Sequence, residues 1–188
     1  FQSRVLEDAF LRLGVPYQVL GTKFFERKEV KDVISYLRVA LNRDSLTDFK
    51  RAIENPKRGI GKVTLLKLFT EGVEALPGTA RKKVVEFFNL LENIQKMTQE
   101  KPLHEVIHFI ITESGMERDL LTGNEEDLIR LENIRELVTL ATKYQELDPE
   151  VALEAFLEES TLISDQDSKD EKEGVKLMTV HASKGLEF

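Results

Sequence analysis

The 188-residue sequence contains no cysteine and no long run of apolar residues. Without cysteine the chain has no disulfide, no thiolate nucleophile and no cysteine-containing metal site, and a reducing compartment suits it. Without an apolar run of about 20 residues or an apolar leader, neither a membrane-spanning segment nor a secretion signal is predicted. We therefore expect a cytoplasmic protein that has no contact with a membrane.

Positive charge is also scarce. The chain has 27 Lys and Arg residues against 34 Asp and Glu, which gives a formal net charge of −7. Non-specific affinity for nucleic acids comes from Lys and Arg side chains that neutralise phosphates. A chain of this charge is not expected to coat a nucleic acid, so any contact with DNA is expected at a local group of basic residues.

Apolar residues recur at helical spacing through most of the sequence. The spacing predicts helices at residues 5–13, 26–41, 46–53, 63–69, 81–97, 103–111, 128–147 and 152–162. Breaks such as Pro77-Gly78 and Gly123-Asn124 separate them. Stretches with a strand pattern occur near the ends, at residues 15–21 and 175–180. This order predicts a mainly α fold, in which a multi-helical subdomain is inserted between strands of an α/β sheet domain.

One segment, residues 165–174, contains no apolar residue and is rich in charge. Such a segment cannot offset its ordering entropy by burial, so it is predicted to be a solvated linker. We expect the chain to be an internal piece of a longer protein with four parts. They are a first piece of the sheet domain, the helical subdomain, the linker and a return to the sheet domain, at residues 1–21, 22–164, 165–174 and 175–188.

Polar side chains are concentrated where the second predicted strand ends, in the string Met178-Thr179-Val180-His181-Ala182-Ser183-Lys184-Gly185-Leu186-Glu187-Phe188. In open α/β sheets, ligands bind outside the carboxyl ends of the strands. From spacing alone, an ordinary exit from strand to loop is the better explanation. The string, however, resembles motif V of superfamily 1 helicases of the UvrD, Rep and PcrA type, whose pattern is close to Met-Thr-x-His-x-x-Lys-Gly-Leu-Glu-Phe.

Three more stretches resemble the same helicase family in the same order along the chain. Gln2-Ser3-Arg4 is similar to its Ala-Gln-Ser-Arg segment. Residues 24–32 are similar to Phe-Phe-Glu-Arg-x-Glu-Ile-Lys-Asp, and residues 58–61 supply the Gly-Ile-Gly loop of the family. The resemblance therefore covers the whole chain, with its markers at residues 1–61 and 175–188.

The resemblance implies an identity for each part of the chain. The helical subdomain looks like accessory subdomain 2B, and the two strands look like pieces of the RecA-like motor domain 2A that 2B interrupts. By analogy with motif V, Thr179 and His181 would face single-stranded DNA, and Glu187 would reach the ribose of ATP. Lys184 and Gly185 would shape the turn between these two contacts.

The intact enzyme implied by the resemblance is an ATP-dependent DNA helicase of repair or replication. It would use ATP and Mg²⁺, and its partners would be single-stranded DNA, the duplex junction and the rest of the helicase chain; other protein partners are unknown. The sequence has no Gly-x-x-x-x-Gly-Lys-Ser/Thr loop, which cradles the triphosphate in such enzymes. We therefore expect no catalytic residue, no bound cofactor and no ATP hydrolysis in this piece alone.

A basic, glycine-containing segment between two predicted helices is the candidate contact with duplex DNA. We call residues 57–62 the glycine loop: Lys57, Arg58, Gly59, Ile60, Gly61 and Lys62. Glycine lets the backbone approach a phosphate closely, and the helix that follows offers free amides and the positive end of its dipole. Its setting predicts a helix-hairpin-helix-like element. A plain glycine-containing turn is the alternative.

A zinc-protease pattern competes with this interpretation. His104-Glu105-Val106-Ile107-His108 satisfies H-E-x-x-H, in which two histidines bind zinc and the glutamate acts as base, and Glu132 or Glu136 is an available third ligand. The neighbouring apolar residues already explain this segment as a core-packing helix, so we predict no metal site. A zinc metallopeptidase and a purely structural helical scaffold remain as alternatives to a helicase.

Two further groups receive no functional role. Residues 81–83, Arg-Lys-Lys, open an amphipathic helix and are interpreted as a solvated face. The pair Phe24-Phe25 stands at the entrance of a helix, where aromatic residues staple the helix to the core more often than they stack on bases.

Overall fold

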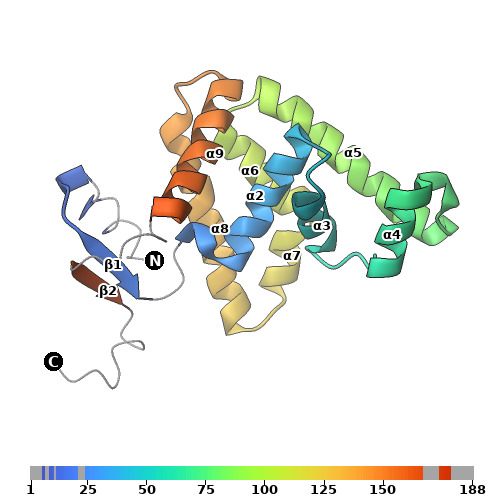
Figure 1. Ribbon diagram of the computed structural model, residues 1–188, viewed down its shortest axis with the longest axis horizontal. Coiled ribbons are helices and arrows are strands. Elements are labelled where there is room, and N and C mark those ends of the chain that lie inside the picture. Colours follow the sequence, from blue (N-terminus) through green and yellow to red (C-terminus); the bar gives the residue numbers. More distant parts are fainter. Residues whose placement is uncertain (1–5, 7–8, 11, 21–23, 167–173, 179–188) are drawn as a thin grey trace. The chain divides into compact units, whose positions relative to one another are not determined.

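The computed structural model describes residues 6, 9–10, 12–20, 24–166 and 174–178 (Figure 1). The chain divides into two compact units, which we describe separately. The helical unit is Glu29–Leu157, and the strand unit combines Phe1–Lys28 with Glu158–Phe188. Most described residues are helical, which confirms the mainly α prediction.

The strand unit contains a parallel pair of short strands. β1 (Tyr17–Leu20) pairs with β2 (Val175–Met178), with Tyr17 opposite Val175. Parallel strands need a crossover connection, and here the chain between them includes the whole helical unit. A Cβ at Gly174 would lie 2.5 Å from the carbonyl oxygen of Pro16, so only glycine fits where the second strand begins.

Helices account for nearly all of the remaining described chain. Their bounds are η1 Phe24–Glu26, α2 Lys28–Leu41, α3 Leu46–Glu54, α4 Lys62–Glu71, η2 Val73–Ala75, α5 Gly78–Glu100, α6 Leu103–Glu113, α7 Met116–Leu121, α8 Glu125–Ala141, η3 Thr142–Tyr144 and α9 Pro149–Gln166. Helix α7 was not predicted from the sequence. Helix α9 includes residues 165 and 166, the first two residues of the predicted linker.

Helix α2 lies in the middle of the helical unit and is buried along most of its length (Figure 1). Val30, Val33 and Leu37 are fully buried, as their helical spacing predicts. Each such side chain contributes about 1.5 to 3 kcal/mol by leaving water. Leu41, which belongs to the same predicted stripe, is instead 48% exposed because the helix ends there.

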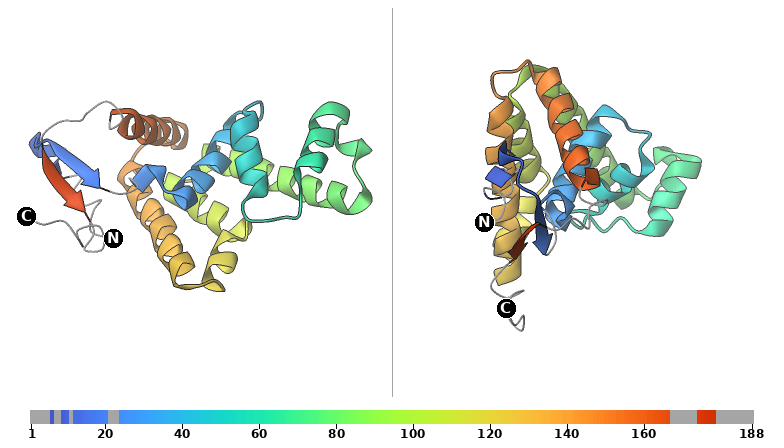
Figure 2. Two further views of the ribbon diagram at one scale, coloured as in Figure 1. Left: turned by 60° about the horizontal axis from the view of Figure 1, so that its bottom comes forward. Right: turned by 60° about the vertical axis from the view of Figure 1, so that its left-hand side comes forward.

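Helix α6 provides the second part of the core and packs against α5, α7 and α8. Its buried residues are Leu103, Val106, Ile107, Ile110 and Ile111. Figure 2 shows that α4 and the first part of α5 project beyond the rest of the helical unit. The segment between α3 and α4 therefore lies at the edge of the helical core.

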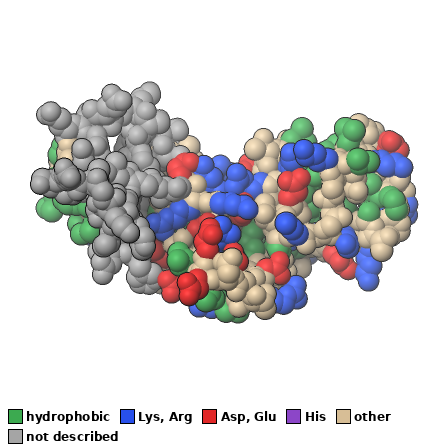
Figure 3. Space-filling model, turned by 90° about the horizontal axis from the view of Figure 1, so that it is seen from below, with side chains coloured by type: hydrophobic (Ala, Val, Ile, Leu, Met, Phe, Trp, Pro, Cys, Tyr) green, Lys and Arg blue, Asp and Glu red, His purple; other side chains and the backbone are tan. Residues whose placement is uncertain are grey.

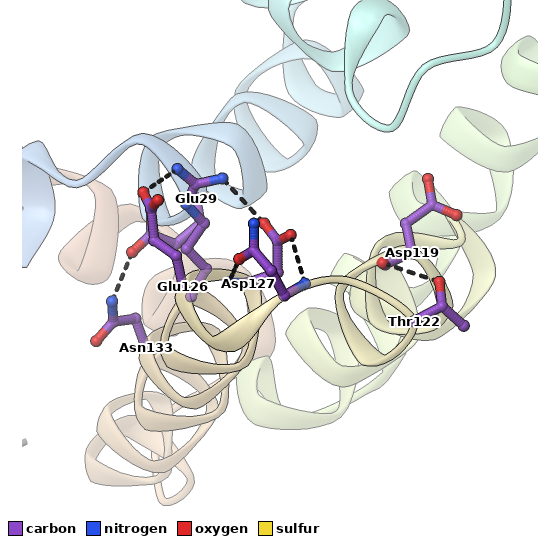
Figure 4. A network of polar contacts seen from close by, with 8 residues as sticks. Glu29, Asp119, Thr122, Glu126, Asp127 and Asn133 are labelled. Atoms are coloured by element: carbon purple, nitrogen blue, oxygen red, sulfur yellow. Dashed lines mark hydrogen bonds and ion pairs between the residues drawn. The ribbon is translucent and has the colours of Figure 1, made fainter.

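Polar contacts fix where α8 begins and how it meets α2 (Figure 4). Asn124 and Asp127 form a capping box, in which each side chain accepts a hydrogen bond from the backbone amide of the other residue. Asn133 donates to Glu29 of α2 over 2.6 Å, which links two helices far apart in the sequence.

No helix among the described residues has the length and apolarity needed to cross a membrane.

Candidate nucleic-acid interface

The glycine loop connects α3 to α4 (Figure 1). Helix α3 ends at Glu54, where Asn55 takes an extended conformation, and the peptide bond between Asn55 and Pro56 is cis. Helix α4 begins at Lys62 with Gly61 as its N-cap. A loop thus joins two helices here, with α4 starting inside the loop segment, and the helix-hairpin-helix-like element stays a prediction.

The two glycines of the loop differ in whether the fold requires a glycine at their position. Gly59 has φ +69°, a left-handed conformation that favours glycine, and a Cβ there would lie 3.1 Å from Nζ of Lys83. Gly61 has φ −94° and ψ 174°, which any residue adopts, and a Cβ there would meet nothing within 4 Å. The fold therefore requires glycine at position 59 but leaves open space at position 61.

Gly61 stands directly before the unbonded amides of α4. The first backbone hydrogen bond of this helix runs from the amide of Leu65 to the carbonyl of Gly61 over 3.0 Å. The amides of residues 62–64 therefore have no acceptor within the helix, and Gly61 offers no capping side chain. Together with the helix dipole, these amides favour an anion at this end.

The side chains of the loop point to different surroundings. Ile60 is only 7% exposed and anchors the loop in the core. Lys57 and Lys62 are exposed at its two ends. Two exposed lysines thus stand at the ends of the loop that contains Gly61.

The guanidinium of Arg58 is engaged within the protein. Nη1 donates to the carbonyl oxygens of Ala52, Ile53 and Pro56 at 3.0–3.1 Å, and Nη2 donates to the hydroxyl of Tyr36 and to the carbonyl of Ser114. This side chain satisfies the end of α3 and ties it to α2 and to the end of α6. The geometry does not support the prediction that Arg58 itself contacts a DNA phosphate, because Nη1 and Nη2 already donate to protein oxygens.

Aromatic rings enclose the same guanidinium. Its central carbon lies 5.2 Å from the ring centroid of Phe87 and 5.8 Å from that of Tyr36, within the range of cation–π attraction. The Tyr36 hydroxyl donates to the carbonyl oxygen of Asn55 over 2.6 Å. Burial raises the pKa of Tyr36 to about 12, although the nearby charge of Arg58 and its hydrogen bond act to lower it.

Sequence reasoning missed Lys83 of α5, whose ammonium donates to the carbonyl oxygen of Arg58 over 2.7 Å. From the sequence, residues 81–83 are interpreted only as a solvated face. The spacing of Lys83 and Phe87, one helical turn apart, is the signal that could have indicated a shared face. Nothing in the sequence indicates that this face meets the glycine loop, which is more than twenty residues away along the chain.

On the face of the molecule shown in Figure 3, the basic side chains are mixed with side chains of other kinds. Figure 3 shows Lys and Arg in small groups between acidic, polar and apolar side chains on the face in view. Several pair with carboxylates, as Arg130 does with Asp127 and Arg135 with Glu117. A contact with DNA phosphates would therefore be local, as the net charge of −7 predicts.

The histidines of the zinc-protease pattern lie on α6, whose apolar residues face the core. His104 is half-buried and His108 is exposed. Within the described part of the chain, no three His, Asp or Glu side chains are placed to hold a metal ion, and this includes Glu132 and Glu136. The structure gives the metallopeptidase alternative no support.

The predicted motif V residues lie outside the described part of the chain: Thr179, His181, Lys184, Gly185 and Glu187. Met178, the last residue of β2, is the last described residue. The roles expected for these five side chains therefore stay predictions.

Comparisons with known proteins agree on one family. The model of the UvrD-like helicase C-terminal domain matches residues 1–188. The chain is 34% identical over 207 residues to the ATP-dependent DNA helicase PcrA of Staphylococcus epidermidis, and 36% identical over 206 residues to that of Staphylococcus aureus. Each alignment covers 100% of this chain and 28% of the relative, so the chain spans less than a third of these helicases. The chain therefore belongs to the UvrD-like helicases and corresponds to their C-terminal domain.

Proposed function

We propose that this chain is the duplex-binding part of an ATP-dependent DNA helicase, and that its glycine loop binds the phosphate backbone of duplex DNA. The similar PcrA proteins are ATP-dependent DNA helicases by name. In this proposal residues 22–164 act as accessory subdomain 2B, and residues 1–21 and 175–188 belong to the RecA-like motor domain 2A. The parallel pairing of β1 with β2 supports this assignment, since it makes the helical unit an insertion between strands of one sheet.

The observation that carries the proposal is the open position at Gly61. Neither its backbone conformation nor a neighbouring atom requires glycine there. A ligand that approaches the backbone closely would require it, and a phosphate oxygen could then accept hydrogen bonds from the first amides of α4. Lys57 and Lys62 would add charge on either side of that phosphate.

Arg58 has a positioning role in this proposal. Its hydrogen bonds hold the carbonyl end of α3 and the turn after α6, and so set the path of the loop. Ile60 is buried and fixes the same path of the loop from the side of the core. The phosphate contacts then come from backbone amides and from Lys57 and Lys62.

The end of the chain would serve the motor. Thr179 and His181 would contact single-stranded DNA, Glu187 would contact the ribose of ATP, and Lys184 and Gly185 would shape the turn between them. The sequence has no phosphate loop, so the triphosphate and its Mg²⁺ would be held by other parts of the enzyme. Of the nucleotide contacts, this chain would supply Glu187 alone.

Binding of a labelled hairpin duplex across a salt series tests the proposal. Lys57→Gln and Lys62→Gln should each lower the slope of log affinity against log salt by about one, since each removes one phosphate contact. Gly61→Val should weaken binding although no charge is lost, because its side chain would fill the space that the phosphate needs. Binding should not depend on the sequence of the duplex.

Lys96→Gln is the matched control, because Lys96 is exposed on α5 but lies outside the loop. It should leave the slope and the affinity close to those of the wild type. Circular dichroism checks that each variant is folded. Unchanged affinity and slope in all three loop variants would show that the glycine loop is a structural turn.

A further inference from the structure

The ammonium of Lys83 lies against the backbone of the glycine loop. It donates to the carbonyl oxygen of Arg58 over 2.7 Å and stands 3.1 Å from the place where a Cβ at Gly59 would be. Lys83 is exposed, so this contact is at the surface of the protein. A cation that lies 25 positions further along the chain is thus placed directly beside the loop.

One face of α5 fixes this placement. Lys83 and Phe87 are one helical turn apart and therefore on the same face of the helix. Phe87 is fully buried, and its ring lies 5.2 Å from the guanidinium carbon of Arg58. On this face of the helix, Phe87 therefore contacts the side chain of Arg58, and Lys83 contacts the carbonyl oxygen of Arg58.

The two basic residues before Lys83 each lie close to a carboxylate, unlike Lys83. Arg81 pairs with Glu74 over 2.9 Å, and the ammonium of Lys82 lies 3.9 Å from Glu86. Among the described residues, no carboxylate lies within 4.0 Å of the Lys83 ammonium. An ammonium has three N–H donors, and the contact with Arg58 occupies one of them. The charge of Lys83 is thus not neutralised by a carboxylate among the described residues, and two of its N–H donors are left for a ligand at the loop.

We propose that Lys83 is a third phosphate-binding cation of the duplex site, and that it also holds the glycine loop in place. This inference rests on the proposed function of the loop. The bound group would be a phosphate of the DNA backbone, which would lie between Lys83 and the cations of the loop. The site is therefore built from two segments: the glycine loop and the first turns of α5.

Three substitutions separate the charge of Lys83 from its hydrogen bond. Lys83→Arg keeps the charge and N–H donors, Lys83→Gln keeps an N–H donor without the charge, and Lys83→Met removes both with little change in shape. Lys82→Gln is the matched control, because Lys82 is the next residue on the same helix and its side chain is 80% exposed. Each purified chain is titrated with the labelled hairpin duplex across a salt series, with circular dichroism in parallel.

The proposal predicts a graded result. Lys83→Gln and Lys83→Met should lower the salt slope by about one and weaken binding about tenfold at low salt, and Lys83→Met should bind more weakly than Lys83→Gln. Lys83→Arg should keep the wild-type slope, and so should Lys82→Gln. Weaker binding with an unchanged slope would show that Lys83 is a structural tie only, and would overturn the phosphate contact.

The loop variants show which idea has failed. If Lys57→Gln and Lys62→Gln lower the slope but the Lys83 variants do not, the loop binds DNA and the inference about Lys83 is wrong. If neither set changes binding, the proposed function of the loop fails. A lower slope in the Lys83 variants alone would place the DNA elsewhere on α5, and would overturn the shared site.

Discussion

Tyr36 is a buried side chain whose ionisation depends on the fold. Its hydroxyl accepts a hydrogen bond from Arg58 and donates one to the carbonyl oxygen of Asn55. Burial raises its pKa from 10.0 to about 12. Between these two values the unfolded chain loses the tyrosine proton while the folded chain keeps it. The stability that this difference contributes is therefore fully present below pH 10 and is lost as the pH rises toward 12.

The substitution Tyr36→Phe tests this pH dependence. We expect the wild type to lose about 1 kcal/mol of this contribution by pH 11, and roughly 2 to 3 kcal/mol in total by pH 12 and above. The variant should lack this loss. At pH 8 it should be less stable by about 1 to 3 kcal/mol, since the part-buried guanidinium of Arg58 and carbonyl oxygen of Asn55 each lose a hydrogen bond. Urea unfolding at pH 8, 9, 10 and 11 measures both effects.

Titrations of the other side chains affect both proteins alike and cancel in the difference between wild type and variant. The difference in unfolding free energy should therefore shrink between pH 9 and pH 11. A difference that stays constant over this range would show that Tyr36 titrates at the same pH in the folded and unfolded chains.

At the scale of single residues, the sequence predicts where the candidate site is but not which side chains face solvent. Gly59 and Gly61 mark the loop because glycine adjacent to basic residues before a helix is a local pattern. The role of Arg58 is set by carbonyl oxygens of residues 52, 53, 56 and 114, which only the packing of several helices brings together. Lys83 was missed for the same reason.

At the scale of helices and strands, local signals decide what can be predicted. The break at Gly123-Asn124 marks where α8 begins, although the helix starts at Glu125 and not at the predicted residue 128, and the core stripe of α6 follows from its 3.6-residue period. Helix α7 has 6 residues, and so few residues cannot show a helical period. Its start is set instead by Gly115, whose φ of 88° turns the chain after α6.

The capping box of α8 provides a prediction at this scale. Asn124→Ala should lower the free energy of unfolding by about 0.5 to 2 kcal/mol, because the amide of Asp127 loses its acceptor. Asn124→Ser should restore most of the loss, since serine is an equally good N-cap residue. Urea unfolding measures both variants. A loss in Asn124→Ser as large as that in Asn124→Ala would mean that the cap hydrogen bond does not hold this end of the helix.

For the whole molecule, we predict that DNA binding and ATP hydrolysis separate in this chain. The purified chain should bind the hairpin duplex through the glycine loop. It should show no saturable ATP hydrolysis, with or without DNA, because its sequence has no phosphate loop and its expected nucleotide contacts reduce to Glu187. Initial rates of phosphate release over a range of ATP concentrations measure this directly.

The complete helicase provides the contrast. There, Glu187→Ala should raise the Michaelis constant for ATP, whereas His181→Ala should mainly weaken the stimulation of turnover by DNA. In the isolated chain, Glu187→Ala should change neither duplex binding nor the background rate of phosphate release. ATP hydrolysis that saturates in the isolated chain and disappears in Glu187→Ala would show that these residues hold and cleave the nucleotide without the rest of the motor. Identical defects of the two variants in the complete helicase would show that His181 and Glu187 do not act on separate ligands.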